Sequence, residues 1–238
     1  MHIVDRLLRD QPSFHSGGDR RWDALPGSLN FLAANTRPGL TTLETGCGAS
    51  TVVIAASGAD HTVISPDSTE HQLVQQYCAS IDVDTSHVTF VDGFSDEVLP
   101  RLLADGVQLD LAFIDGAHGF PYPAVDWHYV SRMLKVGGRL LLDDVPIPAI
   151  SVVYQYMRSE PSWRIDEILD VRTAAATLVD SLPPEDWTTQ RFNKRFDYSY
   201  LPLGDRVKAT TTRDFGLVRR ELGRRFPALK RIPRPGRR

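Results

Sequence analysis

Asp115 and His118 lie three positions apart, where the hydrophobic stretch LDLAFI of residues 109–114 gives way to a glycine-containing loop. A histidine beside a carboxylate can act as a general base, because the imidazole titrates near neutral pH. Two further acids, Asp143 and Asp144, follow a second hydrophobic run. If both runs are neighbouring parallel strands, three aspartates and one histidine meet at one edge of a sheet.

Three converging carboxylates repel one another unless a cation lies among them. Mg²⁺ favours carboxylates combined with water and substrate oxygens, and Mn²⁺ takes similar ligands. We therefore expect Asp115, Asp143 and Asp144 to bind Mg²⁺ or Mn²⁺, with His118 one short loop away as the general base. Simpler alternatives stay open: Asp115 bonds only to loop amides, the adjacent acids point to opposite sides, and His118 only stabilises its own turn.

The elements that must position these residues follow an alternating pattern. Short apolar runs alternate with longer amphipathic runs, with connections of two to six residues, which predicts parallel strands joined by helices. The expected fold class is a single-domain α/β fold with a doubly wound, mostly parallel, Rossmann-like sheet and helices on both faces. The predicted strand–helix pairs are 39–46 with 49–59, 61–67 with 68–81, 88–93 with 95–106 and 109–116 with 124–138, followed by a strand at 139–145.

The chain divides into three expected segments. Residues 1–40 form an N-terminal helical lid, residues 41–182 form the core, and residues 183–238 form a C-terminal extension. Within the core, Ser68 and Ser95 are expected near helix starts, and the segment KVGG is expected to end a helix with Gly137 in a left-handed conformation. A further helix is expected at 149–159, with strands at 163–169 and 175–180.

The loop after the first predicted strand, ETGCGAS, contains Glu44, Gly46, Gly48 and Ser50. Its glycines permit a tight turn and a close approach to a ligand, and the helix that follows offers free N–H groups. A nicotinamide-binding loop would have a third glycine where this chain has Thr51, so an NAD-dependent dehydrogenase is disfavoured.

Acidic residues also follow the next two predicted strands. Asp67 lies about 20 residues beyond the glycines, where a carboxylate can accept both hydroxyl groups of a ribose. Asp92 and Gly93 follow the third strand, where they could contact an adenine. The alternative for Asp67 is a helix cap, and for Asp92 an ordinary turn residue.

The series LETGCGAS, VISPD, VTFVDG, LDLAFIDGAH and VGGRLLLDDV resembles class I S-adenosylmethionine (SAM)-dependent methyltransferases, over roughly residues 41 to 146. It is most similar to a subgroup with a D-G-x-H loop and paired acids, which includes metal-dependent O-methyltransferases. The resemblance implies that the glycine loop with Glu44 holds the methionine part of SAM and that Asp92 contacts the adenine. The family's usual acid at the end of the second strand is Ser65 here, and Asp67 is the candidate substitute.

Acceptor recognition is expected outside the core. The segment FHSGGDRRWD has hinge-like glycines and cations, and could close as a lid over the cleft. Its candidate residues are His15, Arg20, Arg21 and Trp22. The turn FPYP and Trp127 could line an acceptor pocket, although a tryptophan on a helix more often belongs to the core.

Composition limits the protein class. The two cysteines, Cys47 and Cys78, suggest a reducing compartment, and neither a signal-peptide core nor a membrane-spanning run is visible, so we expect a cytoplasmic protein. Residues 219–238 carry nine basic residues against one acid, a net charge of +8 that leaves the rest at −11. We expect this tail to be disordered and do not expect nucleic acid as a partner; a homodimer stays an open alternative.

The leading functional hypothesis is a divalent-metal-assisted O-methyltransferase that uses SAM and a small hydroxylated acceptor, such as a sugar or natural product. One alternative keeps SAM without the metal and methylates an amine or another nucleophile. Another alternative, from a different class, is a non-catalytic nucleotide-binding module that docks through its basic tail.

Overall fold

The computed structural model describes residues 2–15, 24–182, 186–194 and 196–212. The chain forms two compact units, Met1–Phe192 and Asn193–Arg238. The candidate lid residues Arg20, Arg21 and Trp22, and the basic tail from residue 219, lie outside the described residues. No helix in the described part of the chain is long and apolar enough to cross a membrane.

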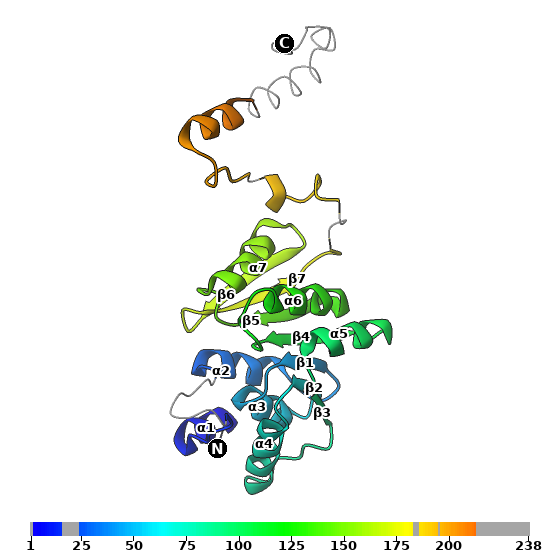
Figure 1. The fold of residues 1–238 in the computed structure, drawn as a ribbon. Coiled ribbons are helices and arrows are strands. Elements are labelled where there is room, and N and C mark those ends of the chain that lie inside the picture. The colour runs from blue at the N-terminus through cyan, green and yellow to red at the C-terminus, as the bar shows by residue number, and fades with distance from the viewer. Residues whose placement is uncertain (1, 16–23, 183–185, 195, 213–238) are drawn as a thin grey trace. The chain divides into compact units, whose positions relative to one another are not determined.

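The first unit is built on a seven-stranded sheet with the order β3-β2-β1-β4-β5-β7-β6 (Figure 1). Strands β1 to β5 are parallel, and β7 runs antiparallel to both of its neighbours. The expected mostly parallel, doubly wound fold is confirmed, and β4 and β5 are neighbours as their proposed role requires. The strands are β1 Thr41–Thr45, β2 Asp60–Ser65, β3 Val88–Asp92, β4 Leu109–Ile114, β5 Leu134–Leu142, β6 Trp163–Leu169 and β7 Thr173–Leu178.

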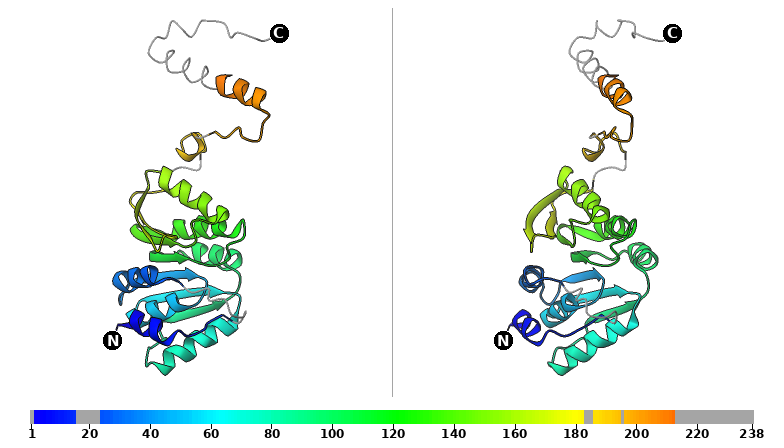
Figure 2. Two further views of the ribbon diagram at one scale, coloured as in Figure 1. Left: turned by 90° about the vertical axis from the view of Figure 1, so that its left-hand side faces the viewer. Right: turned by 60° about the vertical axis from the view of Figure 1, so that its left-hand side comes forward.

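Helices cover both faces of the sheet (Figure 2). Successive side chains of a strand point to opposite faces, and here Phe113 and Leu141 pack into one core cluster while Ala112 and Leu140 pack into the other. The first cluster contains residues of α1 Ile3–Asp10, α2 Pro26–Asn35, α3 Ala49–Ser57 and α4 Ser68–Ser80. The second contains residues of α5 Ser95–Ala104, α6 Tyr122–Met133 and α7 Pro148–Ser159.

Local details differ from the sequence-based expectations. Gly137 has the expected positive φ of 90°, but it lies inside β5 rather than at a helix end. Helix α6 ends at Met133, and the pairing of β4 with β5 shifts its register there, so the four residues KVGG are taken up by a bulge. Helix α4 is capped by Asp67, whose carboxylate accepts the N–H of Thr69 at 2.9 Å, instead of by Ser68.

The turn between β6 and β7 is tied to the start of α2. Asp170 has a positive φ of 52°, and its carboxylate accepts the backbone N–H groups of Gly27 at 3.1 Å and Ser28 at 2.9 Å. These N–H groups have no partner inside the helix, and an anion suits the positive end of the helix dipole. A β-carbon on Gly27 would lie 2.7 Å from the Asp170 carboxylate, so the contact requires glycine.

In the second unit, residues 203–212 are helical. The rings of Phe196 and Tyr198 stack with their centroids 6.3 Å apart.

Candidate active site

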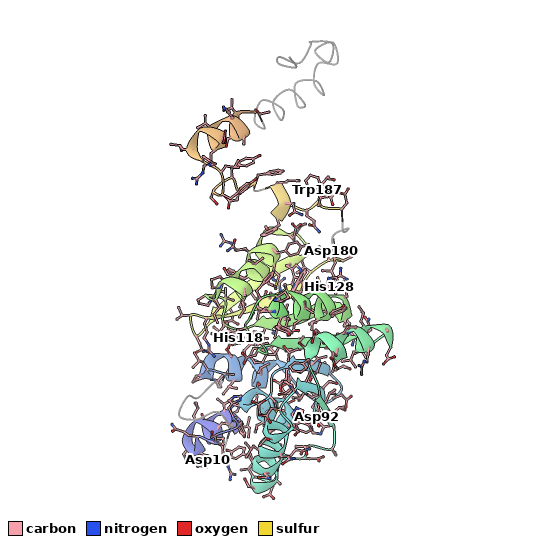
Figure 3. The ribbon with its side chains drawn as sticks, viewed as in Figure 1. Asp10, Asp92, His118, His128, Asp180 and Trp187 are labelled. Carbon is pink, nitrogen blue, oxygen red and sulfur yellow. The ribbon has the colours of Figure 1, made fainter. Side chains whose placement is uncertain are left out.

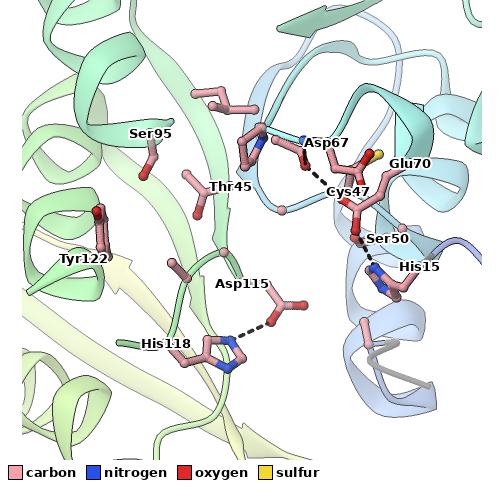
Figure 4. A pocket seen from close by; sticks show the side chains of 18 of the residues that line it. His15, Thr45, Cys47, Ser50, Asp67, Glu70, Ser95, Asp115, His118 and Tyr122 are labelled. Atoms are coloured by element: carbon pink, nitrogen blue, oxygen red, sulfur yellow. Dashed lines mark hydrogen bonds and ion pairs between the residues drawn. The ribbon is translucent and has the colours of Figure 1, made fainter. Parts of the chain in front are cut away.

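A cavity of about 810 Å³ opens at the carboxyl ends of the parallel strands. In an open α/β sheet this edge is where ligands bind, near the point at which the strand order reverses. Figure 4 shows Asp115 and His118 facing the cavity between Ser95 and Tyr122 on one side and Glu70 and His15 on the other. The lining comes from His15 and Ala24 of the N-terminal segment, from the segments after β1, β2, β3 and β4, from Asp144 after β5, and from Arg172.

The glycine loop holds two strand ends together. Gly46 has a φ of 96°, and its N–H donates to the Ile64 carbonyl at 2.9 Å. A β-carbon at Gly46 would lie 2.5 Å from the backbone oxygen of Asp115, so only glycine allows this close approach. Gly48 and Ser50 also line the cavity; Gly48 is the N-cap of α3, and Ser50 lies in the first turn of that helix. The glycine loop therefore forms part of the cavity wall, and its contact with SAM stays a prediction.

Glu44 lies beneath the loop and is 1% exposed. It accepts a hydrogen bond from the Thr51 hydroxyl, and His61 Nε2 lies 3.1 Å from its carboxylate. Glu44 is not among the residues that line the cavity. In the structure Glu44 therefore holds the glycine loop through its contacts with Thr51 and His61. The predicted role of Glu44 in SAM binding stays a prediction.

The carboxylate Glu70 was not predicted from the sequence, although it lines the cavity. Its two oxygens contact different elements: the Ser65 hydroxyl donates to Oε2 at 2.8 Å, and His15 Nδ1 lies 2.7 Å from Oε1. Asp67 lines the cavity as well while it caps α4. The region around Ser65 thus contains two acids, although neither is at the strand end itself.

Asp92 lies at the end of β3, on a different part of the sheet from His118 (Figure 3). Its carboxylate is 2.7 Å from His71 Nδ1, its side chain is 66% exposed, and it is not among the cavity-lining residues. The lining residues after β3 are Phe94 and Ser95, beyond the turn at Gly93. The predicted adenine contact of Asp92 is untested, and Phe94 offers an apolar ring on the cavity side of the same loop.

His118 lies between two carboxylates. Its Nε2 is 3.5 Å from Asp115 Oδ1, and its Nδ1 is 3.3 Å from Asp144 Oδ2. The interaction with Asp115 raises the pKa of His118 above its ordinary value, and burial opposes this effect. Burial raises the pKa of Asp115 to about 7, although His118 and Arg172 act in the opposite direction. Both Asp115 and His118 therefore bind a proton more readily than the free side chains do.

The adjacent acids after β5 have different surroundings. Asp143 is 1% exposed; Arg172 Nη2 lies 2.8 Å from its Oδ2, and the Thr173 hydroxyl donates to its Oδ1. Asp144, with a positive φ of 51°, lines the cavity, and Arg172 Nη1 lies 3.5 Å from its Oδ1. The sequence did not reveal Arg172, which lies in the turn before β7.

These contacts do not fit the predicted metal site. The guanidinium of Arg172 engages both Asp143 and Asp144, and the remaining oxygen of Asp144 faces His118. In the part of the chain that the structure describes, no group of three or more His, Cys, Asp or Glu side chains is arranged to hold a metal ion. The geometry brings Asp115, His118 and Asp144 together as predicted but pairs the acids with an arginine.

The predicted acceptor-pocket residues are only partly at the cavity. Tyr122 lines it. Trp127 instead packs in the core, with its ring 5.0 Å from that of Tyr156 and 6.4 Å from that of Trp163.

Comparisons with known proteins agree with this architecture. Residues 43–145 match a family model described as a methyltransferase domain. No curated protein matches the chain significantly. Among solved structures, the chain is similar to an O-methyltransferase from Bacillus cereus in complex with SAH, the demethylated product of SAM, with a TM-score of 0.59 and 16% identity over 74% of this chain and 90% of that one.

Two further structures are similar. The O-methyltransferase TomG from Streptomyces achromogenes, in complex with SAM and involved in tomaymycin synthesis, has a TM-score of 0.60 at 14% identity, over 76% of this chain and 91% of that one. TrmN from Thermus thermophilus matches at 15% identity with a TM-score of 0.48, over 63% of this chain. The chain spans about half of TrmN, 47% of its length. At these identities the likeness concerns the fold.

Proposed function

We propose that the protein transfers the methyl group of SAM to a hydroxyl group of a small acceptor; the match of residues 43–145 to a methyltransferase-domain model supports this proposal. The observation that carries this proposal is the position of His118, held between Asp115 and Asp144 at the edge of the cavity. A hydroxyl acceptor must lose its proton, and a histidine placed in this way can accept it.

We place SAM along the glycine loop. Gly46, Gly48 and Ser50 with the start of α3 would hold the methionine part, since backbone N–H groups there can bind its carboxylate. The ribose would lie near Asp67 or Glu70, whose oxygens can accept its hydroxyl groups.

The adenine would then lie against Phe94 and Ser95, which line the cavity after β3. An apolar ring is a suitable surface for a flat base. This arrangement leaves the region of His118, Tyr122 and Asp144 for the acceptor.

In the proposed reaction, the acceptor oxygen attacks the methyl carbon as the bond from that carbon to the SAM sulfur breaks. The acceptor proton passes to His118, and the products are the methyl ether and SAH. Asp115 and Asp144 stabilise the imidazolium that forms, because both carboxylates lie within 3.5 Å of the ring nitrogens. Alignment of donor and acceptor in the cavity supplies the rest of the acceleration.

The test is transfer of a labelled methyl group. The full chain is incubated with methyl-labelled SAM and a panel of sugars, phenols and amines, and the products are identified by mass spectrometry. We expect the label on an acceptor oxygen. Label found only on nitrogen would favour the amine-acceptor alternative, and absence of any product while calorimetry detects SAM binding would favour a non-catalytic nucleotide-binding protein.

A further inference from the structure

Arg172 brings a fixed positive charge to the acidic edge of the cavity. It lies in the turn before β7, outside the residues 43–145 that match the methyltransferase family. Its guanidinium nitrogens approach Asp143 at 2.8 Å and Asp144 at 3.5 Å, and the residue lines the cavity with a 29% exposed side chain. The guanidinium therefore contacts both acids, and the side chain is partly exposed at the cavity.

We propose that the guanidinium of Arg172 is the resident cation of this site, where it takes the place of a divalent metal and faces the acceptor oxygen. The proposal rests on the proposed function for the identity of the acceptor, but not for the occupancy of the acidic site. A guanidinium is charged at all physiological pH values and presents several N–H donors in a plane. It can pair with two carboxylates and still offer a donor to an oxygen that becomes negative.

The position of Arg172 is built by the surrounding chain. The N–H of Arg172 donates to the Leu169 carbonyl at 3.0 Å, and its carbonyl accepts the N–H of Val145 at 2.9 Å. The next residue, Thr173, donates its hydroxyl to Asp143 and accepts that of Ser28 at 2.9 Å. Hydrogen bonds of the backbone and of the Thr173 side chain thus fix the turn that carries Arg172. The contact of Arg172 with the acids therefore does not require a flexible loop to become ordered.

A divalent ion would have to displace this guanidinium. Asp143 is buried, and loss of Arg172 would leave that charge without its ion-pair partner. Conversely, substitution of Arg172 by a neutral side chain removes the cation that pairs with Asp143 and Asp144, and carboxylates without a cation partner are ligands that Mg²⁺ and Mn²⁺ favour. The proposal thus predicts that the wild type does not bind a divalent metal ion at these acids and that a variant with a neutral residue at position 172 does bind one.

The test is a Mn²⁺ titration of the full-length protein followed by electron paramagnetic resonance, which needs neither SAM nor turnover. We expect the wild type to leave the free Mn²⁺ signal unchanged and Arg172→Gln to bind Mn²⁺ at least about tenfold more tightly. Arg164→Gln is the matched control, because Arg164 is an exposed arginine of the same hairpin that pairs with Asp166. This control should behave as the wild type.

Stoichiometric Mn²⁺ binding by the wild type that Asp144→Asn removes would overturn the proposal, as would a folded Arg172→Gln that binds no more Mn²⁺ than the wild type. If Arg172→Gln does not fold, the wild-type titration decides alone. Once an acceptor is known, wild-type turnover should stay within about twofold in excess EDTA, and Arg172→Gln should lose about 10²-fold in kcat with partial recovery in Arg172→Lys. Failure of methyl transfer would count against the proposed function and leave the Mn²⁺ result intact.

Discussion

The Asp170 carboxylate accepts the backbone N–H of Ser28 at 2.9 Å, across 142 positions of the chain. This bond joins the β6–β7 turn to the first turn of α2. Arg172, two residues further on, reaches the acids of the cavity from the same turn. A single carboxylate thus stabilises one helix terminus and fixes the segment that carries the positive charge of the site.

Replacement of Asp170 by alanine should lower the free energy of unfolding by about 1–2 kcal/mol, since loss of a helix cap typically costs this much. Urea unfolding measures the change, with an unaltered dependence on denaturant. Glu167→Ala, at an exposed position of the same hairpin, should differ little from the wild type. An Asp170→Ala protein as stable as this control would show that the bond contributes nothing.

Gly46→Ala should be more damaging than Gly39→Ala, although both glycines have positive φ values, 96° and 83°. At Gly39 no atom lies within 4 Å of the added carbon, so only backbone strain of about 1–2 kcal/mol is expected. At Gly46 the carbon also meets the Asp115 carbonyl at 2.5 Å, which should add about 2 kcal/mol or more and weaken SAM binding. Equal losses of stability in the two variants would contradict the contact.

His118→Gln should lower kcat by about 10²–10⁴-fold, the usual contribution of a placed general base. The affinity for SAM, measured by calorimetry, should change little because the glycine loop is untouched. His128→Gln is the control: His128 is exposed on α6 and lies outside the cavity lining (Figure 3). Full activity of His118→Gln with a hydroxyl acceptor would remove His118 from the mechanism.

The stability of the wild type should fall as the pH rises from about 4 to 7, relative to Asp115→Asn. Burial raises the pKa of Asp115 from 3.8 to about 7 in the folded protein, so the folded state binds more protons than the unfolded state across this interval. Stability then declines by at most about 1.4 kcal/mol per pH unit from this group.

Urea unfolding at pH 4.5, 6 and 7.5 measures the difference between the two proteins. Asp105→Asn, at an exposed acid after α5, should follow the wild-type curve. Parallel curves for the wild type and Asp115→Asn would mean that Asp115 titrates at the same pH in both states.

Much of the site follows from the sequence because parallel strands end at one edge of a sheet. The apolar runs before Asp115 and Asp143 are long enough to identify β4 and β5, and their adjacency brings His118 next to Asp144. The glycine loop is recognisable in the sequence for a separate reason: a tight turn between a strand and a helix requires residues without side chains.

Arg172 could not be found in this way, because its position depends on pairing between distant strands. Strand β7 inserts between β5 and β6, which places an arginine from late in the chain beside acids that end β5. The position of Glu70 at the cavity could not be predicted for a different reason. Glu70 follows Asp67 by three positions, and ordinary helix starts show the same spacing of acidic residues.

The strand order has a consequence for biosynthesis. Domains begin to form from the N-terminal end as the ribosome delivers the chain, yet β7 is an inner strand and one of the last to be translated. A nascent polypeptide that stops before residue 172 therefore has Asp143 and Asp144 without their arginine, beside an unoccupied edge of β5. Until the β6–β7 hairpin has been translated, that edge of β5 can pair with other chains. Once the hairpin is complete, β7 covers the edge of β5 and Arg172 pairs with the two acids.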